Sequence, residues 1–247
     1  MLGIEVDALT TSELSDLVSD AILSGRKKIV ANHNLHSLYL FHHDPQLRNF
    51  FRTADTVHVD GMSLVNLGRV LGYALLPKHR ITYLDWLPQL MAQGEKRGWR
   101  FFYLGGGPGI AEEAARRLRL MHPSLVLQTY HGYFDRKGLE NQEVLEYLAA
   151  CRPDVLLVGM GMPIQEQWIL ENLEHIPAHV ILTAGAFFDY IAGVIPVPPR
   201  WSGRFGVEWL FRLAAEPRRL WRRYLWEPWY VAGLVVGRWV RGHDARP

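Results

Sequence analysis

The sequence predicts an α/β protein: a Rossmann-like, mostly parallel sheet flanked by helices, followed by a helical C-terminal appendage rich in Arg and Trp. Three observations predict this fold class. Short apolar runs alternate with segments of helical periodicity, which is the pattern of βαβ units. Glycine-rich turns follow several of these runs, as at the carboxyl ends of parallel strands. Residues 200–247 differ in composition from residues 1–199, so we expect an α/β core and a separate appendage over these two ranges.

The expected elements follow in chain order. The chain opens with a βαβ unit, because Met1 to Val6 is a short apolar strand candidate, Thr11 to Leu23 a helix and Lys28 to Ala31 a strand. A helix from Tyr83 is expected to end at Gly94 or Gly98. The run Val155 to Val158 is apolar throughout, as in a strand buried on both faces of a parallel sheet. The other expected strands are Thr56 to Val59, Phe101 to Leu104, Leu127 to Gly132 and Val180 to Thr183, and the other expected helices include Pro45 to Ala54, Met62 to Leu71, Ala111 to Leu120 and Gln142 to Ala150.

Composition limits the class of protein. With 247 residues, 49% of them hydrophobic and 21% charged, the chain has the profile of one globular domain with an appendage. The single cysteine, Cys151, excludes an intramolecular disulfide framework and fits a reducing compartment. The N-terminus lacks a basic segment followed by an apolar core, and no apolar run approaches the roughly 20 residues of a transmembrane helix. We therefore expect a cytoplasmic protein, or one bound peripherally to the inner face of the cell membrane.

Polar side chains follow two of the expected strands. The amide and imidazole groups at the end of the strand from Lys28 could bind a ligand, although Asn is also common at turns and helix starts. These residues are Asn32, His33, Asn34 and His36. Asp60 ends the strand from Thr56 and precedes Gly61. A carboxylate in this place can act as a general base on a substrate hydroxyl. The alternative is an Asp that caps the following helix.

Glycines follow two other expected strands. A strand, a glycine turn and a helix form a phosphate-binding arrangement, because backbone N–H groups and the helix N-terminus point at the anion. The first turn fits the dinucleotide pattern G-x-G-x-x-G poorly, since Ile110 stands at the third glycine position; a nucleotide diphosphate is the better ligand. After the second turn, Gln165 and Glu166 either face this ligand or are ordinary first-turn helix residues. The glycines that we assign to the donor nucleotide are Gly105, Gly106, Gly107, Gly109, Gly159 and Gly161.

Other acids and metal motifs give weaker signals. Asp189, within FFDYIAG, is a second candidate acid or the anchor of a turn or helix. The sequence contains no DxD pair, no HExxH and no cluster of His or Cys at ligand spacing. We therefore expect neither a metal nor another cofactor.

The appendage differs from the core in charge and in Trp content. Residues 200–247 contain ten Arg, no Lys and four acids, a balance of +6, whereas the rest of the chain balances at −4. They also hold six of the nine Trp. Arg interleaved with Trp and Tyr suits anionic lipid headgroups, and it would also suit nucleic acid. A third interpretation is that the tail binds neither and is simply a solvated basic segment. Pro217 is expected to start a second helix after Glu216 rather than to stand within one.

Taken together, the motifs resemble the WecG/TagA/CpsF family of bacterial glycosyltransferases, from Leu2 to about Tyr224. Members transfer a sugar from a UDP donor to a polyprenyl-diphosphate-linked sugar. The motifs that carry the resemblance are VDG (Val59–Gly61), YLGGGPGIAEEAA (Tyr103–Ala115), GYF (Gly132–Phe134), VGMGMPIQEQWI (Val158–Ile169), GAFFDYIAG (Gly185–Gly193) and EWLFRLAAEPRRLWRRY (Glu208–Tyr224).

The resemblance implies roles for particular residues. Asp60 is the general base of an inverting transfer, and Gln165 lies near the nucleotide. Asn32 and Asn34 lie near the acceptor or donor sugar, although some members have Thr where this chain has Asn32; with them we group Thr82. The charge of the leaving diphosphate is stabilised by the tail arginines Arg212, Arg219 and Arg222, with Arg223 adjacent.

These roles lead to one preferred function. We expect transfer of a sugar, with N-acetylmannosamine as the first choice, from a UDP-sugar to polyprenyl-diphosphate-linked GlcNAc in cell-wall or surface polysaccharide synthesis. UDP-glucose, UDP-galactose or a UDP-hexuronic acid are alternative donors. The tail is expected to fold over the carboxyl edge of the sheet and to meet the membrane surface, and a homo-oligomer could cover apolar surface. Remote alternatives are an NAD(P)-dependent oxidoreductase and a nucleic-acid-binding protein, whereas the preferred function involves no nucleic acid.

Overall fold

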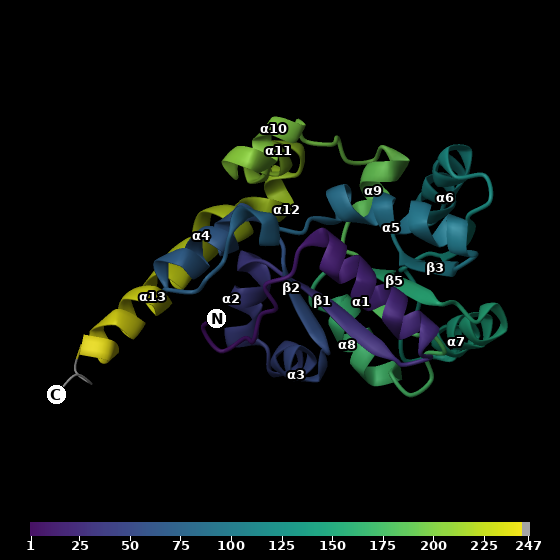
Figure 1. Cartoon of the computed structure of the whole chain (residues 1–247), viewed down its shortest axis with the longest axis horizontal. Coiled ribbons are helices and arrows are strands. Elements are labelled where there is room, and N and C mark those ends of the chain that lie inside the picture. The colour runs from purple at the N-terminus through teal and green to yellow at the C-terminus, as the bar shows by residue number, and fades with distance from the viewer. Residues whose placement is uncertain (244–247) are drawn as a thin grey trace.

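A computed structural model describes residues 1–243 and shows an α/β fold with one six-stranded sheet (Figure 1). All strands are parallel, in the order β2-β1-β6-β5-β3-β4. Because the strands are parallel, all of their carboxyl ends meet at one edge of the sheet. The strands are β1 (Lys28–His33), β2 (Thr56–Val59), β3 (Arg100–Gly105), β4 (Val126–Tyr130), β5 (Val155–Gly159) and β6 (Val180–Thr183).

Helices cover both faces of the sheet. The core on one face includes α1, α5, α6 and α9, and the core on the other includes α2, α3, α4, α7 and α8. The bounds of these helices are α1 (Thr11–Leu23), α2 (Leu35–His43), α3 (Pro45–Thr53), α4 (Met62–Val70), α5 (Tyr83–Arg97), α6 (Ile110–Met121), α7 (Leu139–Cys151), α8 (Ile164–Asn172) and α9 (Phe187–Ala192), with a short 3-10 turn at Pro77–His79. The predicted fold class is confirmed.

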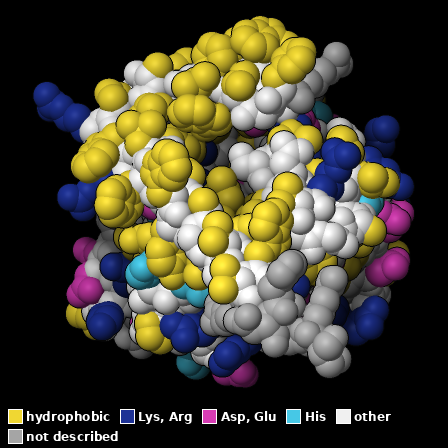
Figure 2. All heavy atoms as spheres, turned by 90° about the vertical axis from the view of Figure 1, so that its left-hand side faces the viewer, with side chains coloured by type: hydrophobic (Ala, Val, Ile, Leu, Met, Phe, Trp, Pro, Cys, Tyr) yellow, Lys and Arg dark blue, Asp and Glu magenta, His cyan; other side chains and the backbone are white. Residues whose placement is uncertain are grey.

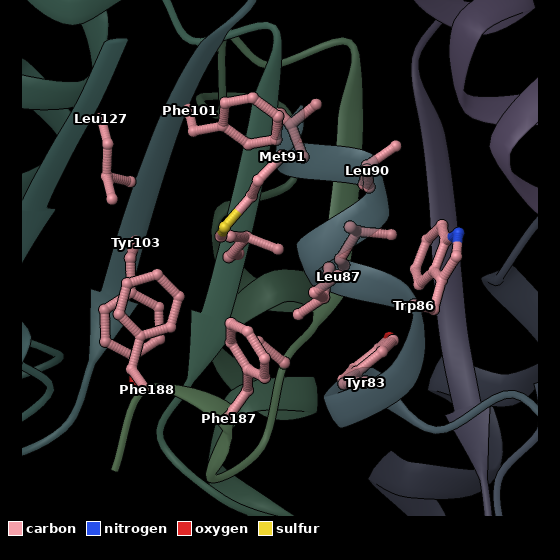
Figure 3. Packing of buried hydrophobic residues seen from close by; sticks show 14 of the residues in the cluster. Tyr83, Trp86, Leu87, Leu90, Met91, Phe101, Tyr103, Leu127, Phe187 and Phe188 are labelled. Atoms are coloured by element: carbon pink, nitrogen blue, oxygen red, sulfur yellow. The ribbon is translucent and has the colours of Figure 1, made fainter. Parts of the chain in front are cut away.

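The apolar strands supply both cores because successive side chains of a strand point to opposite faces. In β3, Phe101 and Tyr103 enter the first core, whereas Phe102 and Leu104 enter the second. The Tyr103 ring stacks on Phe188 of α9 with 3.5 Å between ring centroids (Figure 3). Such strands read as continuous apolar runs in the sequence, which is why they were predictable.

Helix α5 ends at the second of the two glycines predicted to close it. Gly98 has a φ of 69°, a left-handed conformation that favours glycine, and it is the C-cap. Gly94 instead lies within the helix, where an added Cβ would stand 2.3 Å from the ring of Phe101. Gly94 is therefore a packing residue, which allows α5 to approach β3 closely.

The predicted strand from Met1 to Val6 is wrong. The N-terminal segment meets the sheet at one point only, an isolated bridge between Asp7 and His58 of β2. The left-handed backbone at Leu2 (φ 46°) and at Gly3 (φ 100°) breaks the extended run. Part of the segment is nevertheless buried, since Ile4 is 2% exposed.

The appendage is helical and packs on the core near α2 and α4 (Figure 1). Pro217 stands at the first position of α12, which confirms that it starts a second helix. Val231 joins the core beside α2, and Leu220 is 2% exposed. No helix in residues 1–243 combines the length and apolarity needed to cross a bilayer. The segments are α10 (Arg200–Phe205), α11 (Glu208–Ala215), α12 (Pro217–Trp221), a π-helical turn (Arg222–Trp226) and α13 (Glu227–His243).

Candidate active site

A cavity of about 460 Å³ opens at the carboxyl edge of the sheet, beneath the tail helices. We call it the central cavity. It is bounded by the loops after β1, β2, β5 and β6 and by α11, α12 and the π-helical turn. Most of the predicted site residues meet there: Asn32, Asn34, Asp60, Thr82, Gly161, Gln165, Arg212, Arg219 and Arg222, together with Arg223.

A second cavity, of about 770 Å³, adjoins the first at the glycine turns, and we call it the glycine cavity. Gly106, Gly107 and Gly159 line it, and Gly161 and Arg219 line both cavities. Backbone N–H groups of such turns suit the phosphates of a nucleotide.

The other two predicted glycines line neither of these cavities. A Cβ on Gly105 would stand 2.4 Å from the carbonyl oxygen of Gly159, so this glycine allows the two turns to approach each other. Gly109 is the N-cap of α6 with a φ of 80°. Both glycines shape the loop around the glycine cavity rather than its wall.

Asp60 is positioned by its neighbours in the sheet. Its backbone N–H donates to the carbonyl oxygen of His33 at 2.7 Å, and Asn32 Nδ2 donates to Asp60 Oδ2 at 3.3 Å. Asn32 is held in turn by Thr183 Oγ1, which donates to Asn32 Oδ1 at 3.1 Å. The N-cap of α4 is Gly61, without a side-chain cap bond, so the capping alternative for Asp60 is wrong. The carboxylate is left free to face the cavity.

Charges around Asp60 act on its pKa in opposite directions. Burial raises the pKa of this carboxyl above its usual range, and the nearby carboxylate of Glu208 raises it further. The guanidinium groups of Arg80, Arg212 and Arg223 lower it. Glu208 itself accepts from Arg80 Nη2 at 3.0 Å. A carboxyl with a raised pKa is a stronger base than an exposed one, which suits proton removal from a hydroxyl.

We expect Glu208→Gln to move the acid limb of the pH profile of activity to lower pH. A base works only when deprotonated, so kcat/KM falls as the pH drops through the pKa of Asp60. Glu208 raises this pKa, and its neutralisation therefore lowers it. The profile of kcat/KM between pH 4 and pH 8 checks this, with Glu112→Gln, an exposed acid of α6, as the control. An unchanged or upward-shifted limb would contradict the coupling.

Three tail segments bring arginines to the cavity. Arg212 comes from α11, and its guanidinium lies 5.8 Å from the ring centroid of Tyr190. Among the described residues, the buried Nε of Arg212 has no hydrogen-bond partner. Arg219 comes from α12 and donates from Nε to Glu216 at 2.7 Å, while the exposed Arg222 follows in the π-helical turn. The cavity thus has a cationic wall facing Asp60.

Gln165 and Glu166 both lie in the first turn of α8, but in different surroundings. Gln165 Oε1 accepts from the backbone N–H of Gly161 at 3.2 Å, and its Nε2 donates to Glu166 Oε1 at 2.7 Å. Glu166 is 1% exposed and lines neither cavity. Burial raises the pKa of Glu166 to about 7. Gln165 is also buried, at 0% exposed, but of the two residues only Gln165 lines the central cavity, and Glu166 holds its amide.

Asn34 and Thr82 have local structural partners as well as a place at the cavity. Asn34 caps α2, since its Oδ1 accepts from the backbone N–H groups of His36 and Ser37 at 3.0 and 3.1 Å. Thr82 Oγ1 donates to Asp85 at 2.9 Å. Asn34 therefore starts α2, as the helix-start alternative predicts, and also lines the central cavity.

Asp189 belongs to the glycine cavity rather than to the central one. Its backbone carbonyl accepts from the N–H groups of Val194 and Ile195, so it anchors the turn after α9. Burial raises the pKa of its carboxyl, and Glu216 raises it further.

Sequence reasoning named His36 but missed its partner Glu227. His36 and Glu227 line the central cavity and are paired, with 2.8 Å between Nδ1 and Oε2. This pair joins the start of α2 to the start of α13. Glu208 and Arg80 were also missed. The partners are more than a hundred positions apart, and no local pattern in the sequence links them. In residues 1–243, no three His, Cys, Asp or Glu side chains gather closely enough to hold a metal ion.

A parallel sheet with glycine turns, an arginine wall and a carboxylate at one edge is typical of α/β enzymes that act on phosphorylated substrates. The comparison with protein families makes the class specific. The model of the glycosyl transferase WecG/TagA/CpsF family matches residues 1–245, and the chain belongs to this family. It is therefore a glycosyltransferase.

Two relatives illustrate the similarity. The chain is 27% identical to the N-acetylglucosaminyldiphosphoundecaprenol N-acetyl-beta-D-mannosaminyltransferase of Bacillus spizizenii, over 93% of this chain and 87% of the relative. It is 24% identical to the protein of the same name from Staphylococcus aureus, over 90% of this chain and 86% of the relative.

Proposed function

We propose that this protein transfers N-acetylmannosamine from a UDP donor to a polyprenyl-diphosphate-linked GlcNAc, with inversion at the anomeric carbon. One observation carries the proposal: Asp60 and the arginine wall face one cavity at the carboxyl edge of the sheet. The names of the relatives support the sugar and the acceptor, since both are mannosaminyltransferases that act on a GlcNAc-diphosphoundecaprenol.

The proposed reaction is a single displacement. Asp60 takes the proton of the acceptor hydroxyl while its oxygen forms a bond to the anomeric carbon. The bond from this carbon to the phosphate oxygen breaks, and the electron pair leaves with UDP. Arg212, Arg219 and Arg222 stabilise the charge that develops on the diphosphate.

The donor fits across the two cavities. The UDP group occupies the glycine cavity, which Gly106 and Gly107 of the first glycine turn line. Arg219 lines both cavities, which suits a diphosphate between the nucleotide and the sugar. The donor sugar then lies in the central cavity, near Gln165 and Asn32. A sugar with different hydroxyl or acetamido positions would lose hydrogen bonds to these amides.

A donor screen tests the proposal. UDP release is measured with a short-chain polyprenyl-diphosphate-GlcNAc acceptor and a panel of UDP-sugars, with and without EDTA. We expect turnover with UDP-N-acetylmannosamine, unchanged by EDTA because arginines rather than a metal stabilise the leaving group. NMR of the product gives the anomeric configuration. Turnover only with UDP-glucose, UDP-galactose or a UDP-hexuronic acid would reassign the donor, and loss of activity in EDTA would contradict the metal-free mechanism.

The proposal places the protein on the inner face of the cell membrane, where the lipid acceptor is held. Hydrophobic side chains gather on the side of the molecule where the tail lies (Figure 2). Trp226 is 66% exposed and Trp229 is 77% exposed. Exposed Trp with nearby Arg is typical of interfacial helices.

We expect Trp226→Ser combined with Trp229→Ser to weaken binding to anionic vesicles by about tenfold or more, because two interfacial rings are lost. Co-sedimentation with phosphatidylglycerol-containing vesicles measures this. The control is Leu120→Ser, a 71% exposed apolar residue of α6 outside the tail. Equal losses in both proteins would mean that the tail has no special part in membrane binding.

A further inference from the structure

A third cavity lies on the other side of Asp60 and has a different lining. It measures about 380 Å³ and is bounded by the starts of α2 and α4, by α11 and by the segment from the π-helical turn to the start of α13. The side chains that line this cavity and not the central one include Leu35, Met62, Trp209, Tyr224 and Pro228. We call it the apolar cavity.

The three cavities form a row with Asp60 near one junction. Asp60, Arg212 and Arg223 line both the central and the apolar cavity. Arg219 instead lines the central and glycine cavities, and does not line the apolar one. The row therefore runs from the glycine turns, past a cationic wall and a carboxylate, to a cavity that adds aromatic and aliphatic side chains to the charged residues it shares with the central one.

We propose that the apolar cavity is the acceptor site, which binds the sugar and the first isoprenoid units of the polyprenyl-diphosphate substrate. This inference rests on the proposed function. Inversion requires the acceptor oxygen to attack from the side opposite the leaving phosphate. Because Arg219 marks the leaving-group side, the acceptor arrives from the opposite side of Asp60, and the apolar cavity opens there.

The lining suits this ligand. The Trp209 and Tyr224 rings lie with 6.0 Å between centroids, and an aromatic surface of this kind packs well against a sugar face or an isoprenoid. Arg223, shared by both cavities, is placed to meet the acceptor diphosphate. The exposed apolar side chains of the tail continue on the same side of the molecule (Figure 2), so the rest of the lipid chain can remain at the membrane surface.

Two variants separate this site from the donor site. Trp209→Ala removes part of the wall, and Ser63→Trp adds bulk at an exposed position of the lining without disturbing the core. The matched control is Trp201→Ala, since Trp201 is another tail tryptophan, 53% exposed, that lines none of the three cavities. Calorimetry measures the affinity for UDP and for a water-soluble short-chain prenyl-diphosphate-GlcNAc.

We expect Trp209→Ala and Ser63→Trp to weaken binding of the prenyl-diphosphate-GlcNAc by about tenfold or more, and to leave UDP affinity within about twofold. Retained UDP affinity also shows that the variants are folded. Saturating UDP should not displace the prenyl-diphosphate-GlcNAc from the wild type. Competition by UDP, absence of binding to the wild type, or variants that bind like Trp201→Ala would overturn the inference.

The binding measurements do not require sugar transfer. The acceptor-site inference and the proposed function can therefore be contradicted independently of each other. If the variants behave as expected but no UDP-sugar is consumed, the donor half of the proposed function fails and the acceptor site stands. If the wild type transfers sugar while both variants keep the acceptor KM of Trp201→Ala, the function stands and the acceptor site lies elsewhere.

Discussion

Asp60→Asn is expected to lower kcat of sugar transfer by about 10² to 10⁴-fold, because the amide cannot take the proton of the acceptor hydroxyl. The change is nearly isosteric. The backbone N–H of residue 60 still donates to His33, and the N-cap of α4 is Gly61, so the local fold does not depend on the carboxylate. Initial rates at saturating donor and acceptor measure the effect, and UDP affinity should change little.

Two further variants serve as the control for Asp60→Asn and as the test of a rival carboxylate. Asp154→Asn alters an aspartate just before β5, at the opposite edge of the sheet, and should leave kcat within about twofold. Asp189→Asn tests the rival carboxylate, which lines the glycine cavity. Should Asp60→Asn stay active while Asp189→Asn loses activity, the base assignment moves to Asp189.

Arg219→Ala is expected to lower kcat/KM by about 10² to 10³-fold, the usual cost of removing one donor that stabilises charge in the transition state. Arg219 is the tail arginine that lines both the central and the glycine cavity, where the donor diphosphate is proposed to lie. Its partner Glu216 is half-buried, and the Arg219 side chain is 58% exposed. Loss of such a surface pair costs little stability, so Tm should stay nearly constant.

The neighbouring Arg218 supplies the matched control. It lies on the same helix, is exposed and lines neither cavity. Arg218→Ala removes the same charge from α12 and should keep nearly full activity at physiological salt. If both variants lose activity equally, the tail acts through its general positive potential, and a specific contact of Arg219 with the diphosphate is excluded.

Much of the fold was predictable because its signals are local. Strands buried on both faces are apolar throughout, and the glycine turns follow them directly, so the parallel sheet and its carboxyl edge could be located along the chain. The strand at Met1 to Val6 failed because its apolar residues, including Ile4, are buried in an irregular segment beside the edge strand β2. A hydrophobic run indicates that side chains are buried, but it does not show whether the backbone pairs with a neighbouring strand.

The candidate site was predictable only in part. Asp60 could be a base or a cap by pattern, and only the structure shows that Gly61, with a φ of 101°, is the N-cap of α4 in place of Asp60. Gln165 and Glu166 are adjacent and both are buried, yet only Gln165 lines the central cavity. Such a difference depends on the rotation of α8 against the sheet, which its first-turn sequence does not encode.

The sequence by itself determined the α/β class, the glycine turns at the carboxyl edge of the sheet, the helix break at Pro217 and the identities of the base and arginine candidates. The tertiary structure alone decided that Arg212, Arg219 and Arg222 meet Asp60 in one cavity, that Glu208 and Arg80 set opposing charges near it, and that an apolar cavity opens beyond it. The physical reason is the sequence distance over which each kind of information acts. Backbone and periodicity signals act over a few residues, whereas the charges and walls of the site come from segments 100 to 190 positions apart, such as Arg80 with Glu208 and His36 with Glu227.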